Sequence, residues 1–248
     1  MNNNSDKELI KCTGINKWYG NLHALKDMDM TINKGEVIGL IGDNGAGKST
    51  LIKIMCGVHK LDKGDLYFEG KRVSIENPKS AMKLGIETIH QYSTMFFEMS
   101  IASNVFIGRE PKKFGFNFLG LKDEKKMDYE SMKAIKEVGL DLRSPHIPVK
   151  ELSGGERQGV AIARSMYFKS KMLILDEPTN HLSVKETFKV LEYIKGLKSL
   201  GIGSIFISHN LYHVHEVADR VIGMARGEKV CDMDKKDTTV NELIKLIG

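Results

Sequence analysis

The chain has 248 residues, of which 41% are hydrophobic and 28% are charged, a usage that is typical of globular proteins and excludes a disordered or fibrous chain. The net charge is only +5, from 37 Lys and Arg against 32 Asp and Glu, and both signs are mixed along the sequence, so nucleic acid is not expected as a partner. The sequence contains no run of about 18 apolar residues, so no membrane-spanning helix is predicted. Residues 1–6 are polar, so no secretory signal is predicted either.

The first ninety or so residues predict short strands at 9–10, 22–32, 36–41, 64–68 and 85–90, with a helix at 48–56. Residues from about 92 to 150 differ in character, because Met and Phe clusters, a Lys-rich loop and a helical stretch at 123–138 follow one another. We therefore expect an inserted, mostly helical subdomain there. Three cysteines (Cys12, Cys56 and Cys231) without C-x-x-C spacing are expected to be reduced thiols of a cytosolic protein.

After this region, short apolar strands at 172–175, 204–207 and 221–224 alternate with helices at 184–200 and 211–218. Such alternation predicts a mostly parallel sheet covered on both faces by helices. Within the first of these helices, apolar residues at helical spacing predict one apolar face: Val184, Phe188, Leu191, Ile194 and Leu197.

A glycine-rich motif, which we call the phosphate loop, follows the strand at 36–41 and opens a helix. It reads Gly42-Asp43-Asn44-Gly45-Ala46-Gly47-Lys48-Ser49, followed by Thr50. The motif fits G-x-x-x-x-G-K-[ST], in which backbone N–H groups and the positive end of the helix hold a polyphosphate. We expect Lys48 to contact the β- and γ-phosphates and the Ser49 hydroxyl to ligate Mg²⁺. No N-K-x-D run follows, so guanine specificity is not expected.

Two acidic residues, Asp176 and Glu177, end the apolar strand that begins at Met172. Because ligands of parallel sheets bind at the carboxyl ends of the strands, Asp176 is expected to help hold Mg²⁺ and Glu177 to accept a proton from the attacking water. His209 ends the next strand and is a candidate to contact the γ-phosphate or the water. His209 and His213 also have the spacing of zinc ligands, but the Glu of H-E-x-x-H is replaced by Asn210.

A second helix start lies at Leu152-Ser153-Gly154-Gly155-Glu156-Arg157-Gln158. A serine and two glycines at a helix N-terminus form a second anion cradle. The same pattern is also common as a simple N-cap. Since one site rarely needs two cradles, this one is a candidate to serve a second nucleotide or a second subunit.

The order phosphate loop, Gln91, Leu-Ser-Gly-Gly-Glu, Asp176-Glu177 and His209 resembles the nucleotide-binding subunits of ATP-binding cassette (ABC) proteins over about residues 8–247. The resemblance implies an α/β P-loop NTPase (RecA-like) core with a mostly parallel sheet, an N-terminal antiparallel β subdomain and an inserted α-helical subdomain. Residues 1–248 would form one ATPase domain, with the helical subdomain at about 92–159 and the remainder, 1–91 and 160–248, as β subdomain and core.

The same resemblance implies the roles of further residues. Tyr19, with Trp18 as the alternative, would stack on the adenine of ATP. Gln91 would link Mg²⁺ and the attacking water to the transporter contact. The residues that bind the γ-phosphate held by a second protomer would be Ser153, Gly154, Gly155 and Glu156. The active unit would then be a head-to-tail dimer with two ATP molecules at its interface.

Three segments resemble the ATPases of bacterial monosaccharide importers: 104–110, 206–210 and 217–220. That branch implies transmembrane permease subunits, a periplasmic or lipid-anchored sugar-binding protein, and a peripheral place on the cytoplasmic face of the membrane. The segment 177–182 instead is similar to soluble ABC proteins that act on ribosomes or nucleic acid, which remain the alternative. A regulatory module with little turnover is disfavoured by the intact Lys48, Asp176, Glu177 and His209.

Some features of the sequence leave their consequence open. Ser183 stands where both ABC branches usually carry Asp, so the way in which the two sites communicate is not predicted. The transported substrate, the permease and the direction of transport are not fixed by these residues. The loop 111–126, with alternating phenylalanines and lysines, fits either a surface loop packed on the subdomain or a contact with nucleobases or membrane.

Overall fold

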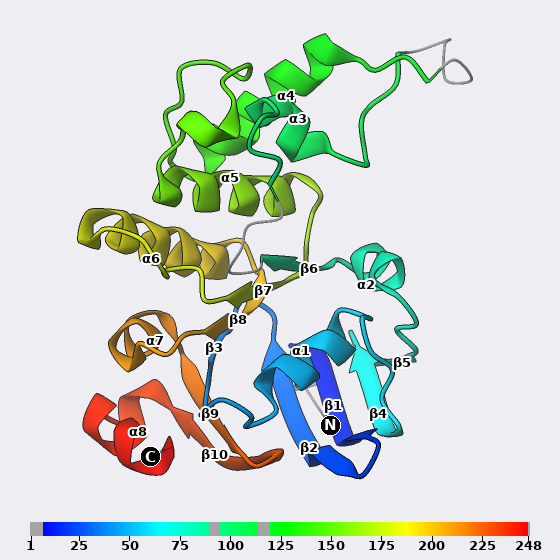
Figure 1. Ribbon diagram of the computed structural model, residues 1–248, viewed down its shortest axis with the longest axis vertical. Helices are drawn as coiled ribbons and strands as arrows, with labels where there is room; N and C mark the ends of the chain where they lie inside the picture. The colour runs from blue at the N-terminus through cyan, green and yellow to red at the C-terminus, as the bar shows by residue number, and fades with distance from the viewer. Residues whose placement is uncertain (1–6, 90–94, 114–119, 248) are drawn as a thin grey trace. The chain divides into compact units, whose positions relative to one another are not determined.

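The computed structural model describes residues 7–89, 95–113 and 120–247, and these form two compact units. Unit 1 consists of residues 1–91, 170–178 and 194–248, and unit 2 of residues 92–169 and 179–193. Both sheets belong to unit 1, whereas helices α3, α4 and α5 belong to unit 2 (Figure 1). Gln91 lies outside the described residues, as does the aromatic part of the loop 111–126, at 114–119.

The first sheet of unit 1 is antiparallel, in the order β2-β1-β4-β5. Its strands are β1 (Glu8–Tyr19), β2 (Leu22–Asn33), β4 (Lys63–Phe68) and β5 (Lys71–Val73). The sequence predicted only a short first strand, but β1 has 12 residues because β2 and β4 pair with it on either side. Register shifts, one of them between Cys12 and Ile15, mark irregularities that let so long a strand twist with its neighbours.

The second sheet has the order β10-β9-β3-β8-β7-β6. Its strands are β3 (Val37–Ile41), β6 (Ile86–Ile89), β7 (Met172–Asp176), β8 (Gly203–Ile207), β9 (Arg220–Ala225) and β10 (Glu228–Asp234). All neighbours are parallel except β10, which pairs antiparallel with β9. β3 and β8 are buried along their whole length, as expected for central strands of a parallel sheet. The predicted mostly parallel sheet and the separate antiparallel sheet are therefore confirmed.

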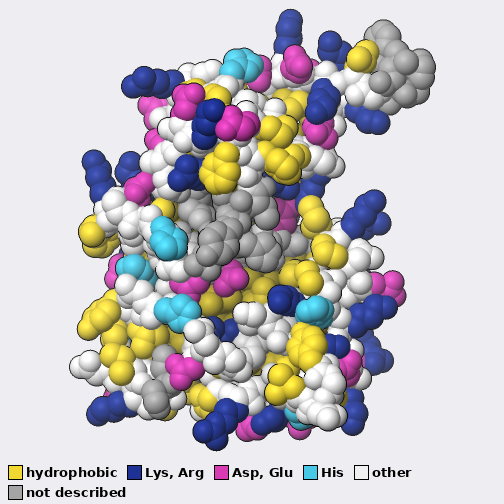
Figure 2. All heavy atoms as spheres, viewed as in Figure 1, with side chains coloured by type: hydrophobic (Ala, Val, Ile, Leu, Met, Phe, Trp, Pro, Cys, Tyr) yellow, Lys and Arg dark blue, Asp and Glu magenta, His cyan; other side chains and the backbone are white. Residues whose placement is uncertain are grey.

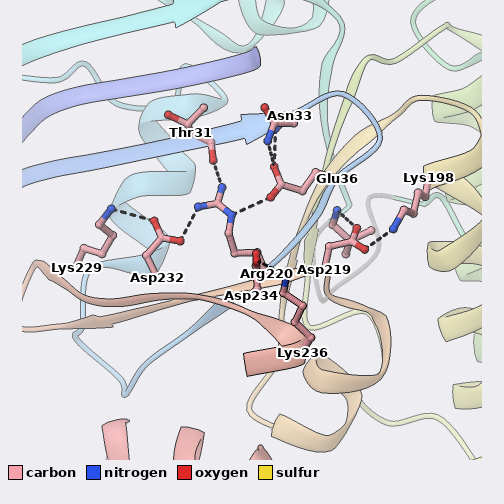
Figure 3. Close-up of polar contacts among 11 residues, drawn as sticks. Thr31, Asn33, Glu36, Lys198, Asp219, Arg220, Lys229, Asp232, Asp234 and Lys236 are labelled. Carbon is pink, nitrogen blue, oxygen red and sulfur yellow. Dashed lines mark hydrogen bonds and ion pairs between the residues drawn. The ribbon is translucent and has the colours of Figure 1, made fainter. Parts of the chain in front are cut away.

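Arg220, the first residue of β9, ties these two sheets together (Figure 3). Its guanidinium pairs with Glu36, just before β3, at 2.8 Å and with Asp232 of β10 at 2.5 Å, and it also donates to the Thr31 carbonyl of β2. The adjacent Asp219 accepts from the Val37 N–H at 3.1 Å. This network holds the start of β3, the strand that leads into the phosphate loop.

The helices of unit 1 are α1 (Lys48–Met55), α2 (Pro78–Leu84), α7 (Leu211–Val217) and α8 (Val240–Ile247), with a short 3₁₀ turn at Lys235–Asp237. Gly39 on β3 lets α7 approach closely, since a Cβ there would lie 2.4 Å from Val214 Cγ1. The buried core of this unit is shared by β1, β2, the parallel sheet and α1.

Unit 2 contains α3 (Ile101–Phe106), α4 (Glu124–Glu137), a 3₁₀ turn (Val149–Glu151), α5 (Gly154–Tyr167) and the first part of α6 (Val184–Ser199). The predicted helix 123–138 is α4, which Asp123 caps by accepting from the Lys126 N–H at 3.2 Å. The predicted apolar face of α6 is wrong at its start: Val184 and Phe188 are 75% and 62% exposed, while Leu191, Ile194 and Leu197 are buried. The helical spacing was correct, but in the first two turns the buried positions are Thr187 and Val190 rather than Val184 and Phe188.

Among the described residues, none of the helices combines the length and the apolar character needed to cross a bilayer. On the face shown in Figure 2, lysine and arginine side chains are interspersed with acidic ones.

Candidate nucleotide site

The phosphate loop connects β3 to α1, as its sequence context predicted. The backbone bends at glycines in the left-handed region, with φ of 142° at Gly42 and 104° at Gly47, the residue before α1. Gly42 is also held next to β9, because a Cβ on it would lie 2.2 Å from the Met224 carbonyl oxygen. Only glycine combines this φ with so close an approach.

A pocket of about 590 Å³ opens over this loop, a size within the range of small-molecule sites. It is lined by Tyr19, Leu22, His23, Ala24, Lys26, the loop residues Asp43, Asn44, Gly45, Ala46, Gly47, Lys48, Ser49 and Thr50, and Arg226. All the residues predicted to bind ATP on this protomer therefore line the pocket, apart from Gly42, which shapes the loop beneath it. Lys26 and Arg226 were not predicted, because they lie outside the motif in sequence.

Of the two candidate aromatic residues for adenine, only Tyr19 lines the pocket, and its side chain is 40% exposed. The Trp18 ring instead stacks on His23, with centroids 4.1 Å apart, and the Lys63 ammonium lies 5.4 Å from its centroid. The Tyr19 ring also has contacts within the protein, since it meets the His59 ring edge-on with centroids 5.5 Å apart and Lys17 Nζ lies 5.7 Å from its centroid, so the pocket lining is what separates the two candidates. Stacking of Tyr19 on adenine stays a prediction that its position favours.

The Lys48 ammonium is oriented by its own loop, since Nζ donates to the carbonyl oxygens of Gly42 at 2.5 Å and Asp43 at 3.0 Å. Burial is the main cause that lowers the pKa of Lys48, and nearby carboxylates, led by Glu177, oppose this shift. The charges of Asp43 and Asp176 act in the same direction as that of Glu177. The lysine and the carboxylates at the end of β7 thus act on one another electrostatically.

Glu177 follows β7 and is 6% exposed. Its φ of 53° lies in the left-handed region, which is strained for a residue with a side chain and is often found at functional sites. The carboxylate accepts from the His209 N–H at 2.8 Å and from the Ser208 hydroxyl at 3.2 Å, and His209 Nε2 lies 3.5 Å from Oε1. Burial is the main cause that raises the pKa of Glu177, while the charge of His209 is the largest effect in the opposite direction.

The oxygen donors of this site fit Mg²⁺, which prefers carboxylate, hydroxyl, water and phosphate oxygens. Ser49 lines the pocket, and Asp176 ends β7 close enough to influence the pKa of Lys48. The part of the chain that the structure describes contains no group of three or more His, Cys, Asp or Glu side chains suited to a metal ion. His213 Nε2 lies 3.2 Å from Asn210 Nδ2, a local contact at the start of α7.

The segment predicted as a second cradle lies within unit 2, at the start of α5. Ser153 caps this helix: its hydroxyl accepts from the Glu156 N–H at 3.3 Å, and its own N–H donates to the Glu156 carboxylate at 2.8 Å. The Gly155 N–H donates to Glu186 Oε1 at 3.2 Å. Ser153, Gly154, Gly155 and Glu156 thus form one helix-start turn, which we call the signature turn.

The glycines of the signature turn have a packing role that the sequence reasoning missed. A Cβ on Gly154 would lie 2.4 Å from Leu182 Cδ2, and one on Gly155 would lie 3.0 Å from Glu186 Cβ. The segment that leads into α6 therefore packs directly on the turn. No local pattern signals this contact, because the two segments are far apart in sequence.

This chain is similar in sequence and in structure to known ATP-binding proteins. The family model described as ABC transporter matches residues 25–180. The xylose/arabinose import ATP-binding protein XylG of Sulfolobus acidocaldarius is 44% identical over 97% of this chain and 94% of its own length. The fructose import ATP-binding protein FrcA of Rhizobium meliloti is 38% identical over 97% of this chain and 94% of its own length.

Some relatives are longer. The ribose import ATP-binding protein RbsA of Caldanaerobacter subterraneus subsp. tengcongensis is 39% identical over 96% of this chain, which covers only 47% of that relative. Among solved structures, the ADP conformation of an ATP-binding cassette of an ABC transporter is similar, with a TM-score of 0.82 and 28% identity over 96% of this chain and 95% of that one.

Proposed function

The chain belongs to the ABC transporter family, and on that premise we propose that it is the ATP-hydrolysing subunit of a monosaccharide importer, working as a head-to-tail dimer with two ATP molecules at the interface. The family resemblance predicted from the order of the motifs is thereby confirmed. The transport of a monosaccharide is supported by the names of the relatives, which are import ATP-binding proteins for xylose and arabinose, fructose and ribose.

The observation that carries the ATPase proposal is the grouping of Lys48, Glu177 and His209 in unit 1. Lys48 would neutralise charge on the phosphates, and Glu177 would accept a proton from the attacking water. His209 would hold the Glu177 carboxylate through its backbone N–H and its ring. The pocket lining supports Tyr19 and the residues from Asp43 to Thr50 as the ATP contacts.

Mg²⁺ bound at Ser49 and Asp176 would neutralise charge on the β- and γ-phosphates. Gln91 is proposed as a further ligand from the family resemblance alone. The side chains and backbone of the protein would orient the phosphates and accept the proton.

The dimer is supported by the presence of two predicted phosphate-binding segments, one in each unit. The phosphate loop and Glu177 belong to unit 1, whereas the signature turn at Ser153 belongs to unit 2. Two separate anion cradles are accounted for when the signature turn of one protomer closes on ATP held by the other. We further propose that the dimer binds transmembrane permease subunits on the cytoplasmic face of the membrane and depends indirectly on a sugar-binding protein.

Affinity purification from detergent-solubilised membranes tests the transporter assignment. The tagged protein should recover a polytopic permease in stoichiometric amount, and addition of the matching sugar-binding protein with sugar should raise its ATPase rate. Recovery of ribosomes, released by high salt and with no permease, would instead support the soluble alternative and overturn the proposal.

A further inference from the structure

Among the residues that the structure describes, three helices begin with the same arrangement of Ser or Thr followed three residues later by Glu. In each, the glutamate accepts from the N–H of the first residue, and its own N–H donates to the hydroxyl. The pairs are Ser153–Glu156 on α5, Ser183–Glu186 on α6 and Thr239–Glu242 on α8. Such capping boxes stabilise helix starts, and glutamine serves in place of glutamate.

Glu186 differs from the other two because it also reaches a second helix. Oε2 accepts from the Ser183 N–H at 2.9 Å and from the Ser183 hydroxyl at 2.7 Å, which leaves Oε1 to accept from the Gly155 N–H at 3.2 Å. Gly155 makes this approach sterically possible, since it has no side chain opposite Glu186 Cβ. One carboxylate thus joins the first turns of α5 and α6.

The Gly155 N–H is one of the donors that the proposed function assigns to the γ-phosphate of the partner protomer. We propose that Glu186 is a positioning residue of the signature turn, whose carboxylate holds the Gly155 N–H within the protomer and yields it to the γ-phosphate when two protomers pair. This inference rests on the proposed function. It adds that the Glu186 carboxylate of the same protomer competes with the γ-phosphate for the Gly155 N–H.

The negative charge of Glu186 determines whether this competition weakens or strengthens pairing of the protomers. The hydrogen bonds from Ser183 are the main cause that lowers the pKa of Glu186, to about 2, so the side chain is an anion at neutral pH. Glu156 already places one carboxylate at the same helix start. Because a second anion on this turn repels the incoming γ-phosphate, removing the charge of Glu186 should favour pairing.

The test uses Glu177→Gln as the parent, which lacks the proposed general base and should accumulate as an ATP-bound dimer. Sedimentation velocity over a range of protein concentrations, with saturating Mg-ATP and low salt, gives the dimer dissociation constant. Adding Glu186→Gln removes the charge and leaves one carbonyl oxygen, which can accept from Ser183 in the capping box while the Gly155 N–H loses its acceptor. This variant should tighten pairing about three- to tenfold, as expected for one charge at a helix N-terminus. High salt should shrink this difference, whereas ATP affinity of the unpaired protomer should not change.

Glu242→Gln in the same parent is the matched control, since it alters the same capping box on α8. It should pair like the parent. If Glu186→Gln pairs no more tightly than the parent, or if Glu242→Gln has an equal effect, the inference is overturned while the proposed function stands. If the parent itself shows no ATP-dependent pairing, the proposed dimer fails and this inference fails with it.

Discussion

The Glu177 carboxylate and the His209 ring lie 3.5 Å apart between Oε1 and Nε2, and the His209 backbone N–H donates to the same oxygen at 2.8 Å. The carboxylate is buried and the ring is largely exposed. Glu177 is therefore held in place by the backbone after β8 while its ionisation responds to a side chain that contacts solvent.

Glu177→Gln should abolish turnover and leave ATP binding intact. Glutamine can keep the hydrogen bonds to His209 and Ser208, but it accepts no proton, and general-base catalysis is typically worth ~10²–10⁴ in rate. Steady-state phosphate release and equilibrium binding of a fluorescent ATP analogue check the two parts. A hydrolysis rate within about threefold of the wild type would refute the general-base role.

The pH dependence of hydrolysis should reflect the raised pKa of Glu177. Because the ionised form is the active base, activity is present above this pKa and lost as pH falls through it, so the acid limb of kcat should lie above the ordinary value of 4.5. His209→Gln removes the charge that favours ionisation and should move the limb to higher pH. An acid limb that stays in place in this variant would contradict the coupling between the two residues.

The same raised pKa has a consequence for stability. The folded protein is favoured while Glu177 is protonated, and this contribution is lost as pH rises through the folded pKa. The melting temperature of Glu177→Gln should therefore exceed that of the wild type at neutral pH. The difference in melting temperature should vanish below the unfolded pKa. A difference that stays the same from pH 4 to pH 8 would contradict the raised pKa of Glu177.

Ser153→Arg should lower ATPase activity at least about tenfold, as loss of a hydrogen-bond donor to transition-state charge commonly does. ATP affinity of the unpaired protomer should stay nearly unchanged, because Ser153 is not among the residues that line the pocket over the phosphate loop.

Mixing Ser153→Arg with Lys48→Ala provides the sharpest check on this assignment. A mixed head-to-tail dimer contains one composite site with both an intact loop and an intact signature turn, so activity should exceed that of either variant alone. Equal loss of ATP affinity and activity in Ser153→Arg, with no recovery on mixing, would place the serine in its own protomer's site.

Gly42→Ala should lower the free energy of unfolding by about 3 kcal/mol, since the new methyl group meets the Met224 carbonyl and the backbone stays in a strained region. Gly45→Ala is the matched comparison: Gly45 also has positive φ, but no atom lies within 4 Å of its Cβ position. Its cost should be only about 1 kcal/mol. Urea denaturation of both variants measures the difference, and equal losses would rule out the close approach to β9.

Much of the fold could be predicted because the signals are local. The phosphate loop, with a strand before it and a helix after it, and the apolar strand before Asp176 each lie within about a dozen residues. The length of β1 could not be predicted, because its extent depends on β2 and β4 pairing on either side. Likewise, Val184 and Phe188 lie at helical spacing on α6 but are exposed, and spacing alone does not reveal which face of a helix is packed.

In the candidate site, too, some residues could be predicted from local sequence patterns and others could not. Lys48, Asp176, Glu177 and His209 end predicted strands or begin predicted helices, so the sheet alone brings them together. Arg226 reaches the pocket from the turn after β9, and Glu186 reaches Gly155 across 31 residues of chain. Contacts of this kind depend on tertiary packing, and neither residue belongs to a motif that would single it out.

The parallel strands β6 and β7 are neighbours, with Ile86 opposite Met172, although most of unit 2 separates them along the chain. Closing so long a loop costs conformational entropy, but the cost rises by only about 0.6 kcal/mol for each doubling of loop length. The intervening polypeptide can therefore gain or lose residues with little penalty to the strand that carries Asp176. Pairing of β6 with β7 is expected to come late in folding, after the local contacts on either side of it have formed.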